Sequence, residues 1–509
     1  MELYLSKSKY CKAVQCPKML WMQQNRPELY DDSVMDEAIL EKGQEVGDLA
    51  RGLFGAYTVV EFGDYPDMLK QTQELLENGT EIIAEASFAY KGLFCRVDIL
   101  RNLGGNKCEL YEVKSSTSIH DIYYHDVAFQ YYVLTKLGYE VTKACLVHVN
   151  KEYIRHGELD IQELFTINDI TDDSRARFTE VDSNLDFYSK YLDAVDEPEQ
   201  PLGEHCFKPY HCGFFHHCSK DLPHPNVFQL AGMQLRTKMR FYREWRVSLE
   251  ELAKDKSING NCMLQIEHEI NDLPPLINRD SIASFMRQLY YPIYFLDFES
   301  FQPAIPLYEN SKPFEQIVFQ YSLHYIEYEG GTLHHKEYLA EPGEDPRRRL
   351  AEQLCSDIPV NVCVTAYNMT FEKGRIKELA QLYPDLSDHL MNIHDHIVDL
   401  MIPFQRKDYY CKAMQGSYSI KYVLPALFPN DPALDYHNLE GIHHGGEASA
   451  AFSNMQHMPP EQLKTTRHNL LKYCELDTYA MVKIWERLKE VIQKNQNRSG
   501  YLACTKNVP

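Results

Sequence analysis

The stretch YPIYFLDFES, residues 291–300, sets two acidic side chains in an otherwise apolar and aromatic run. A run of this kind predicts a buried β-strand. Asp297 and Glu299 are two residues apart, so both point to the same face of that strand. Because a solvated strand is not usually flanked by Tyr294, Phe295 and Phe298, the pattern favours a carboxylate site on a sheet over a charged surface.

Further strands and helices are predicted on the C-terminal side of this strand. The pattern indicates strands at QIVFQYSLHYIEY (316–328), TLHHKEYLAE (332–341) and NVCVTAYN (361–368), and helices over 345–356, 371–383 and 468–494. Three strands, a helix, a strand and a helix in this order predict an α/β core with a partly antiparallel sheet.

Two more acids and a tyrosine complete a candidate metal site. Glu372 lies in AYNMTFEKGR, just after the fourth predicted strand, and Asp477 lies in the last helix. Tyr473 precedes Asp477 by four residues and therefore shares its helix face. Four carboxylates can hold two divalent cations about 4 Å apart, and a tyrosine can orient the attacking water. The alternative is a set of surface acids, which are common in an acid-rich chain.

These motifs resemble the DEDD exonucleases of the ribonuclease-H-like fold, in their tyrosine subtype. The resemblance rests on the Asp-x-Glu strand, on the Asn-x-x-x-acid turn, on Tyr-x-x-x-Asp, and on SYSIKYVLPALF (417–428), which is similar to the segment before the last motif. It implies a 3′-5′ exonuclease module that holds Mg²⁺ or Mn²⁺, with the catalytic residues Asp297, Glu299, Glu372, Tyr473 and Asp477. Most families have Asp where this chain has Glu372, so the metal geometry must adapt to one extra methylene.

A second carboxylate cluster is predicted nearer the N-terminus. Residues 80–116 predict three strands with a hairpin turn at 104–106, followed by a helix over 122–137 and another strand. Glu112 and Lys114 share one strand face, and Asp98 is expected beside them across the hairpin. Two carboxylates suit Mg²⁺ or Mn²⁺, the lysine can balance charge on a phosphate, and Gln130 on the helix can brace the site. The alternative is a charged pair on a surface strand.

The stretches GQEVGDLARGLF (43–54), GLFCRVDIL, YEVKSS and DVAFQYYVL resemble the PD-(D/E)XK nucleases. The match is to the RecB-like branch that carries an iron–sulfur cluster, which includes CRISPR-adaptation nucleases and the AddB helicase-nuclease subunit. It covers residues 1–220 and implies Asp98 and Glu112 as metal ligands, Lys114 as the catalytic lysine and Gln130 as the helix glutamine. Many members have a metal-binding His where this chain has Gly47. Either Glu45 or Asp48 substitutes for it, or the metal is held more weakly.

Cys206, Cys212 and Cys218 recur every six residues in HCFKPYHCGFFHHCSK, and Cys16 lies in QCPKMLW near the chain start. One N-terminal cysteine plus three C-terminal ones is the arrangement of the cluster-bearing nucleases, and it implies four thiolates on a [4Fe–4S] cluster. The gap between the first two of the three is wider than is usual in the CRISPR-associated members. The alternatives are zinc on cysteines and on His205, His211, His216 or His217, three unlinked thiols, and Cys11 in place of Cys16.

A long helix is predicted over 226–256, inside an expected helical linker. Arg236, Arg240 and Arg243 form one stripe in LRTKMRFYREWR, interleaved with aromatic residues. Such a stripe can track a phosphate backbone, with aromatics for stacking. The alternative is a solvated helix face whose aromatics pack inward. The expected division is a RecB-like domain over 1–222, the linker over 223–288, an exonuclease-like domain over 289–490, and a flexible tail over 491–509.

The composition constrains the partners. The 52 basic and 74 acidic residues give a net charge of −22, which argues against passive coating of nucleic acid but leaves room for carboxylate-bound cations. No membrane span or secretory signal is recognisable, so a cytoplasmic location is expected. The whole chain resembles a bacterial family of uncharacterised proteins that fuses the two modules, a restriction-endonuclease-like core and a ribonuclease-H-like core. We expect a two-module α/β nuclease acting on DNA or RNA; the alternative is a module that grips DNA without cutting beside an active exonuclease.

Overall fold

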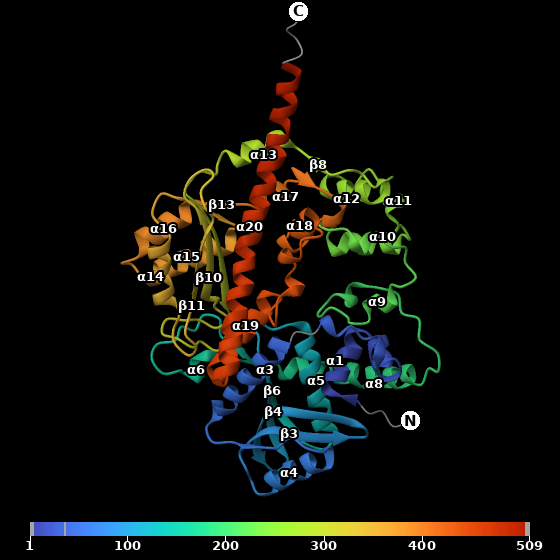
Figure 1. Cartoon of the computed structure of the whole chain (residues 1–509). Helices are drawn as coiled ribbons and strands as arrows, with labels where there is room; N and C mark the ends of the chain where they lie inside the picture. Colours follow the sequence, from blue (N-terminus) through green and yellow to red (C-terminus); the bar gives the residue numbers. More distant parts are fainter. Residues whose placement is uncertain (1–4, 35–36, 504–509) are drawn as a thin grey trace, which may run out of the picture. The chain divides into compact units, whose positions relative to one another are not determined.

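The computed structural model describes residues 5–34 and 37–503. They form two compact units, both of mixed α/β structure (Figure 1). The first unit runs to Asp221 and also includes Pro303–Glu315. The second comprises Leu222–Gln302 and continues from Gln316, so the segment expected as a linker is grouped with the second unit. The α/β class predicted from the sequence is therefore confirmed.

The first unit is built on a sheet with the strand order β2-β3-β4-β5-β6-β7, in which β1 also pairs with β4. β3, β4 and β5 are antiparallel neighbours, and β6 runs parallel to β5. The three strands predicted over 80–116 are thus confirmed. The strands are β1 (Leu5–Ser6), β2 (Thr58–Val59), β3 (Ile82–Tyr90), β4 (Leu93–Gly104), β5 (Lys107–Lys114), β6 (Glu140–Val149) and β7 (Phe165–Asp169).

Two hydrophobic cores cover the two faces of this sheet. Leu110 of β5 packs with Phe129 of helix α5, whereas Tyr111 packs in the core that contains Val46 of helix α3. Because strand side chains alternate, Glu112 lies on the α5 face. The helices are α1 (Lys7–Gln15), α2 (Pro17–Asn25), α3 (Glu37–Ala50), α4 (Tyr65–Glu77), α5 (Asp121–Lys136), α6 (Ile161–Leu164), α7 (Thr171–Ala176), α8 (Phe178–Leu192) and α9 (Phe215–Cys218).

The segment Pro303–Glu315 completes the first unit, although it follows a strand of the second. Ala304 is fully buried in the core that contains Val149. The Arg155 guanidinium donates to the Pro306 carbonyl at 3.0 Å, and the Asn310 amide donates to the Arg155 carbonyl at 2.8 Å. The sequence patterns did not predict this segment as part of the first unit.

The second unit contains a five-stranded sheet in the order β11-β10-β9-β12-β13. β9, β10 and β11 are antiparallel, and β12 runs parallel to both β9 and β13, which confirms the predicted partly antiparallel core. Its strands are β9 (Ile293–Phe301), β10 (Ile317–Ile326), β11 (His334–Leu339), β12 (Cys363–Ala366) and β13 (Ile397–Asp399), and a separate pair is formed by β8 (Leu276–Ile277) and β14 (Tyr409–Tyr410).

Helices cover both faces of this sheet, so β9 is apolar on both faces except at its two acidic residues. Phe295 packs in the core with Leu476 and Trp485 of the long helix α20, whereas Leu296 packs with α14, α15 and α16. Asp297 and Glu299 follow Phe295 at the same parity and share the α20 face. The helices are α10 (Leu235–Arg243), α11 (Leu249–Leu252), α12 (Gly260–Asn271), α13 (Arg279–Met286), α14 (Arg347–Asp357), α15 (Thr370–Leu382), α16 (Ser387–Asp395), α17 (Ile402–Gln405), α18 (Ile420–Leu427), α19 (Gly445–Asn454) and α20 (Pro460–Ala503).

One prediction about helix extent was wrong. The single helix expected over 226–256 is divided into α10 and α11, because Trp245 adopts a left-handed φ of 57° that ends α10 and turns the chain back. The Val227 amide then donates to the Val247 carbonyl at 2.9 Å. Helix α20 continues as far as Ala503, residues 504–509 lie outside the described part, and the flexible tail over 491–509 stays a prediction.

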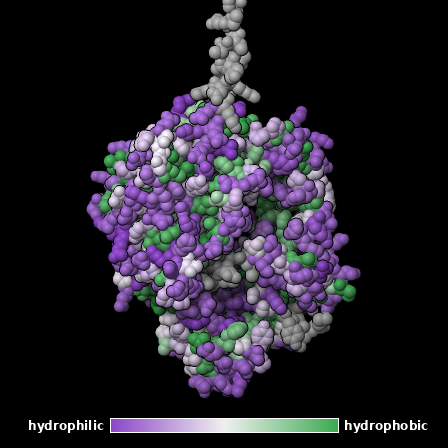
Figure 2. Space-filling view, viewed as in Figure 1, coloured by the Kyte–Doolittle hydropathy of each residue, from purple (hydrophilic) through white to green (hydrophobic). Residues whose placement is uncertain are grey.

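No helix in the described ranges combines the length and the apolar character needed to cross a membrane. Figure 2 shows a face on which hydrophilic residues predominate and hydrophobic residues are scattered among them.

Candidate functional sites

Four acids predicted from separate stretches converge in the second unit. Asp297 and Glu299 extend from β9, Glu372 from the first turn of α15, and Asp477 from α20. Glu372 is 2% exposed and Glu299 is 8% exposed, and the two aspartates are partly buried. Burial and the negative charges of Asp477, Glu299 and Glu372 raise the pKa of Asp297 well above its usual range. The structure therefore brings the predicted quartet together.

The quartet has little internal charge compensation. In the described part of the chain, none of its four carboxylates forms an ion pair with a lysine or arginine. Lys421 is the nearby cation, which holds down the pKa of Glu299 and Asp477. Burial still raises the pKa of Asp477 to about 7 and that of Glu372 to about 8. Buried carboxylates without cationic partners are costly, and bound divalent cations would offset that cost.

The donor atoms fit divalent cations. One oxygen each of Asp297 and Glu299 and the Cys474 sulfur lie within 4.8 Å of one another, a group that does not include Glu372 or Asp477. The Glu372 Oε2 atom is buried and has no hydrogen-bond partner. Burial and Asp297 hold the pKa of the Cys474 thiol well above its usual value, so carboxylate oxygens are the available ligands. Oxygen donors suit Mg²⁺ or Mn²⁺.

Two tyrosines lie beside the acids. The Tyr436 hydroxyl donates to Asp477 Oδ1 at 2.6 Å, and the Tyr436 and Tyr473 ring centroids are 6.0 Å apart. Burial and Asp477 raise the pKa of Tyr473, so its phenol stays protonated at neutral pH. Tyr473 is therefore placed as predicted. Tyr436 was not predicted, because the residues around it form no recognisable motif.

Asp399 of β13 holds the turn that carries Glu372, and it was also missed. Its carboxylate accepts from the backbone amides of Asn368, Met369 and Met401 at 3.0, 3.1 and 2.9 Å. Asn368 has a left-handed φ of 73° at this turn. Burial and the charge of Asp399 together raise the pKa of Glu372.

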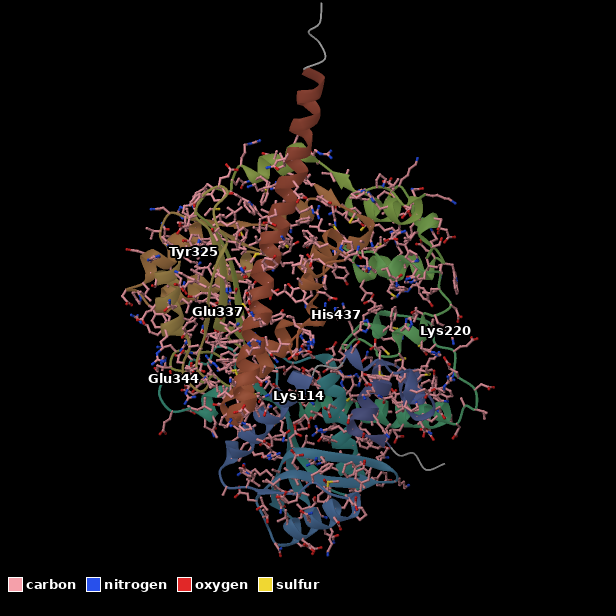
Figure 3. All side chains as sticks on the ribbon, in the orientation of Figure 1. Lys114, Lys220, Tyr325, Glu337, Glu344 and His437 are labelled. Atoms are coloured by element: carbon pink, nitrogen blue, oxygen red, sulfur yellow. The ribbon has the colours of Figure 1, made fainter. Side chains whose placement is uncertain are left out.

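A hollow of about 890 Å³ adjoins this site within the second unit. Its lining includes Lys421, Tyr436 and the histidines His437, His443 and His444; Figure 3 labels His437. Lys421 and Tyr436 also interact with Asp477, so the hollow lies beside the quartet, although its lining does not include the four acids.

The first unit contains the second predicted cluster, in a cleft of about 470 Å³. Lys114, labelled in Figure 3, contacts Glu112 at 2.7 Å and Asp126 at 2.5 Å. The Gln130 amide donates to Glu112 Oε2 at 2.7 Å, and Asp98 Oδ2 accepts from the Val113 amide at 2.7 Å. The four predicted residues are therefore brought together, and Asp126, which the prediction missed, joins them.

Lys7 is the unexpected member of this cluster. Its ammonium group lies 2.9 Å from both oxygens of Glu112 and 3.6 Å from Asp98 Oδ1, between the two predicted metal ligands. Burial disfavours its charge, but Asp98 and Glu112 nevertheless hold the pKa of Lys7 above its usual range. Three carboxylates therefore face two ammonium groups, whereas the quartet of the second unit has no such ion pair among the residues that the structure describes. The sequence around Lys7 carries no signal that would have identified it.

The two candidate substitutes for the missing histidine differ in their position relative to the cleft. Gly47 and Asp48 line the cleft, but Asp48 Oδ1 is bound to Arg51 at 2.8 Å. Glu45 is exposed and does not line the cleft.

The four predicted cysteines line one small cavity in the first unit, of about 20 Å³. Burial and the proximity of Cys16, Cys212 and Cys218 raise the pKa of Cys206 to about 12. Met19, Met22 and Phe214 supply apolar walls. Cys11 lines the carboxylate cleft instead, which excludes it from this group.

The distances between the thiol sulfur atoms affect which metal group the four cysteines can bind. Among the described residues, the groups of three or more ligand atoms within 4.8 Å of one another do not include these cysteines. A tetrahedral zinc site, with bonds of 2.3 Å, needs sulfur atoms about 3.8 Å apart. An iron–sulfur cluster binds each thiolate through a different iron and so holds the sulfurs further apart. Of the histidines proposed for zinc, His217 is bound to Glu197 at 3.0 Å. His205 also lines the cavity, and its Nε2 atom is buried without a hydrogen-bond partner, so four thiols and one imidazole are available to a metal group.

The predicted basic stripe lies on α10. Arg236, Arg240 and Arg243 are exposed, Phe241 is buried, and Trp245 is 75% exposed. Part of the aromatic set therefore packs inward, as in the alternative interpretation, while the three guanidinium groups face solvent.

Comparison with known proteins gives partial matches. A family model described as "Domain of unknown function (DUF2779)" matches residues 294–419, which include Asp297, Glu299 and Glu372 but not Asp477. The chain is 27% identical over 219 residues to Uncharacterized protein MG366 of Mycoplasma genitalium, covering 40% of this chain and 32% of that protein. It is 25% identical over 237 residues to Uncharacterized protein UU173 of Ureaplasma parvum, covering 42% and 33%. The chain thus spans about a third of the length of these relatives. No solved structure matches it.

Proposed function

We propose that this protein is a metal-dependent nuclease whose second unit removes nucleotides from the 3′ end of DNA or RNA. The observation that carries the proposal is the convergence of four carboxylates, two of them buried and two partly buried, which form no ion pair with a lysine or arginine among the described residues. Two divalent cations carry four positive charges, which balance the four carboxylates, and two-metal sites are typical of phosphodiester hydrolysis.

Each residue has a distinct role in this proposal. Asp297, Glu299, Glu372 and Asp477 hold Mg²⁺ or Mn²⁺, which would activate water and stabilise the leaving oxygen. The protonated phenol of Tyr473 orients the attacking water, and Tyr436 fixes Asp477 through its hydrogen bond. Lys421 and the histidines lining the hollow face the phosphates of the substrate strand. The water adds to phosphorus and the P–O3′ bond breaks, which releases a nucleoside 5′-monophosphate.

The sheet order supports the same proposal. Strand β9 lies in the middle of the five-stranded sheet, with antiparallel β10 and β11 on one side and parallel β12 and β13 on the other. This agrees with the partly antiparallel α/β core that the sequence predicts, and it places the Asp-x-Glu strand at the centre of the sheet.

For the first unit we propose a nucleic-acid-binding module that does not cut in this arrangement. The specific observation is Lys7, whose ammonium group lies between Asp98 and Glu112, where the nuclease resemblance implies a metal. Four thiolates from Cys16, Cys206, Cys212 and Cys218 would hold a [4Fe–4S] cluster that stabilises this module.

A cleavage assay tests both proposals. A 5′-labelled single strand, DNA and RNA in separate reactions, is incubated with Mn²⁺ and the wild-type protein, Asp297→Asn, Lys114→Ala or Glu337→Gln. Glu337 is an exposed acid on β11, so its variant controls for loss of charge on the same sheet. We expect a progressive ladder that is lost in Asp297→Asn, by at least about 100-fold, and retained in the other two. Internal cuts lost in Lys114→Ala would instead assign catalysis to the first unit. A ladder retained in Asp297→Asn would refute the proposed exonuclease site.

A further inference from the structure

A second cluster of metal-ligating side chains lies on the sheet of the second unit, apart from the acidic quartet. His324 of β10 and His335 of β11 are direct cross-strand partners, with ring centroids 4.5 Å apart. Glu475 of α20 completes the group, and one ligand atom from each residue lies within 4.8 Å of the other two. Figure 3 locates the two strands by Tyr325 and Glu337.

A hydrogen-bond network contacts one nitrogen of each imidazole. The Thr478 hydroxyl oxygen lies 2.8 Å from His324 Nδ1 and 2.7 Å from Ser322 Oγ, and Ser322 Oγ lies 2.9 Å from His335 Nε2. The other ring nitrogens, Nε2 of His324 and Nδ1 of His335, lie outside this network and are the atoms that would bind a metal ion.

Partners that orient an imidazole through its second nitrogen are a regular feature of metal sites. Here Thr478 contacts the second nitrogen of His324, and Ser322 contacts the second nitrogen of His335.

One oxygen of the Glu475 carboxylate is available to bind a metal ion. Lys472 binds Glu475 Oε2 at 2.6 Å, which leaves Oε1 for a cation. The Glu475 side chain is 32% exposed, so solvent can supply a fourth ligand. His324, by contrast, is 5% exposed and anchors the group on the sheet.

We propose that His324, His335 and Glu475 bind a divalent transition-metal ion of the zinc type, which ties α20 to β10 and β11. Two imidazoles and a carboxylate are a zinc ligand set, whereas Mg²⁺ prefers oxygen ligands alone. The ion would differ in kind from those proposed for the quartet, and this proposal does not depend on nuclease activity. Because α20 also carries Tyr473 and Asp477, the site would fix the helix that presents them.

Metal binding by the full chain tests the proposal. The protein is stripped with a chelator, equilibrated with a slight excess of Zn²⁺ over all candidate sites in the presence of Mg²⁺, and freed of unbound metal, and bound zinc is measured by atomic emission for the wild type, His335→Ala, Glu475→Gln and His334→Ala. His334 is the matched control, because it neighbours His335 on β11 and is not part of the hydrogen-bond network. We expect the wild type and His334→Ala to bind about one equivalent more than the other two variants.

The cysteines and the quartet are present in every variant, so the difference isolates this site. Co²⁺ gives a second readout: the bands lost in His335→Ala should be visible d–d bands without a sulfur charge-transfer band. Glu475→Gln keeps the side-chain shape and decides the question if His335→Ala fails to fold. Equal metal content in Glu475→Gln and His334→Ala would overturn the proposal.

Discussion

Lys7 and Lys421 show how the position of one ammonium group changes what a carboxylate cluster can do. Lys7 lies within hydrogen-bond distance of Glu112, a side chain that is 2% exposed. Lys421 influences Glu299 and Asp477 electrostatically but forms no ion pair with them in the described chain. The carboxylates of the first cluster are therefore paired with ammonium groups, whereas those of the second have no such ion pair among the described residues and would gain more from bound cations.

Replacing Lys7 should expose this difference. Lys7→Met leaves Glu112 buried beside Asp98 with one cation fewer, so we expect a loss of about 3 kcal/mol in the free energy of unfolding. Mn²⁺ should restore part of the loss, because it takes the place of the ammonium group. Calorimetry with chelator and with Mn²⁺ measures both effects. Lys9→Met, an exposed lysine on the same helix, is the control, and equal stability of the two variants would contradict this account of Lys7.

The quartet predicts a pH dependence of stability in the metal-free protein. Burial raises the pKa of Asp477 to about 7, above an unfolded value of about 3.9, so the folded state binds more protons between these pH values. Stability is therefore fully present below pH 4 and is lost as the pH rises through 7. With a discount for partial exposure, we expect Asp477 to contribute about 2 kcal/mol of this loss. Urea unfolding at pH 5 and pH 8 with chelator should show a smaller difference for Asp477→Asn, and an unchanged difference would refute the assignment.

At the scale of elements, the periodicity of the sequence predicted the features that depend only on residues close together in the chain, such as the position of a strand or the face of a helix. The apolar run around Asp297 identified β9, and the four-residue spacing of Tyr473 and Asp477 placed both on one helix face. The break after α10 escaped prediction, because it depends on the left-handed backbone of Trp245 and on the pairing of Val227 with Val247. Lys7, Tyr436 and Asp399 were missed for the same reason: each reaches its site through the fold, and none has a local pattern.

The turn into α15 should depend on Asp399. Asp399→Ala leaves the Asn368, Met369 and Met401 amides without their acceptor, so we expect a loss of about 2 kcal/mol in the free energy of unfolding. Denaturant unfolding measures this loss. Asp399→Asn keeps an acceptor oxygen and should lose less, whereas Asp395→Ala, an exposed acid four residues earlier, should be nearly neutral. A loss in Asp399→Ala no larger than in Asp395→Ala would show that the carboxylate does not hold the turn.

At the scale of the whole chain, residues far apart in sequence close the first unit. The Gln15 amide donates to the carbonyls of His205 and Tyr210 at 2.7 and 2.8 Å, and Lys18 binds Glu197 at 2.6 Å. These contacts lie beside Cys16 at one end and Cys206 at the other. A metal group on the four thiols would therefore hold together two segments that already meet.

The proposed iron–sulfur cluster predicts the colour and the iron content of the purified protein. Protein purified without oxygen should be brown, with a broad absorbance near 400 nm and bound iron. Cys212→Ser should remove both, because its thiol lines the cavity with the other three cysteines. Cys11→Ser should retain both, because Cys11 lines the carboxylate cleft instead. Loss of the cluster should also lower the melting temperature of the first unit, since binding of a group to the folded state alone stabilises that state. A colourless, iron-free wild type would remove the cluster, and zinc found in its place would mean that the thiols draw closer together on binding the metal.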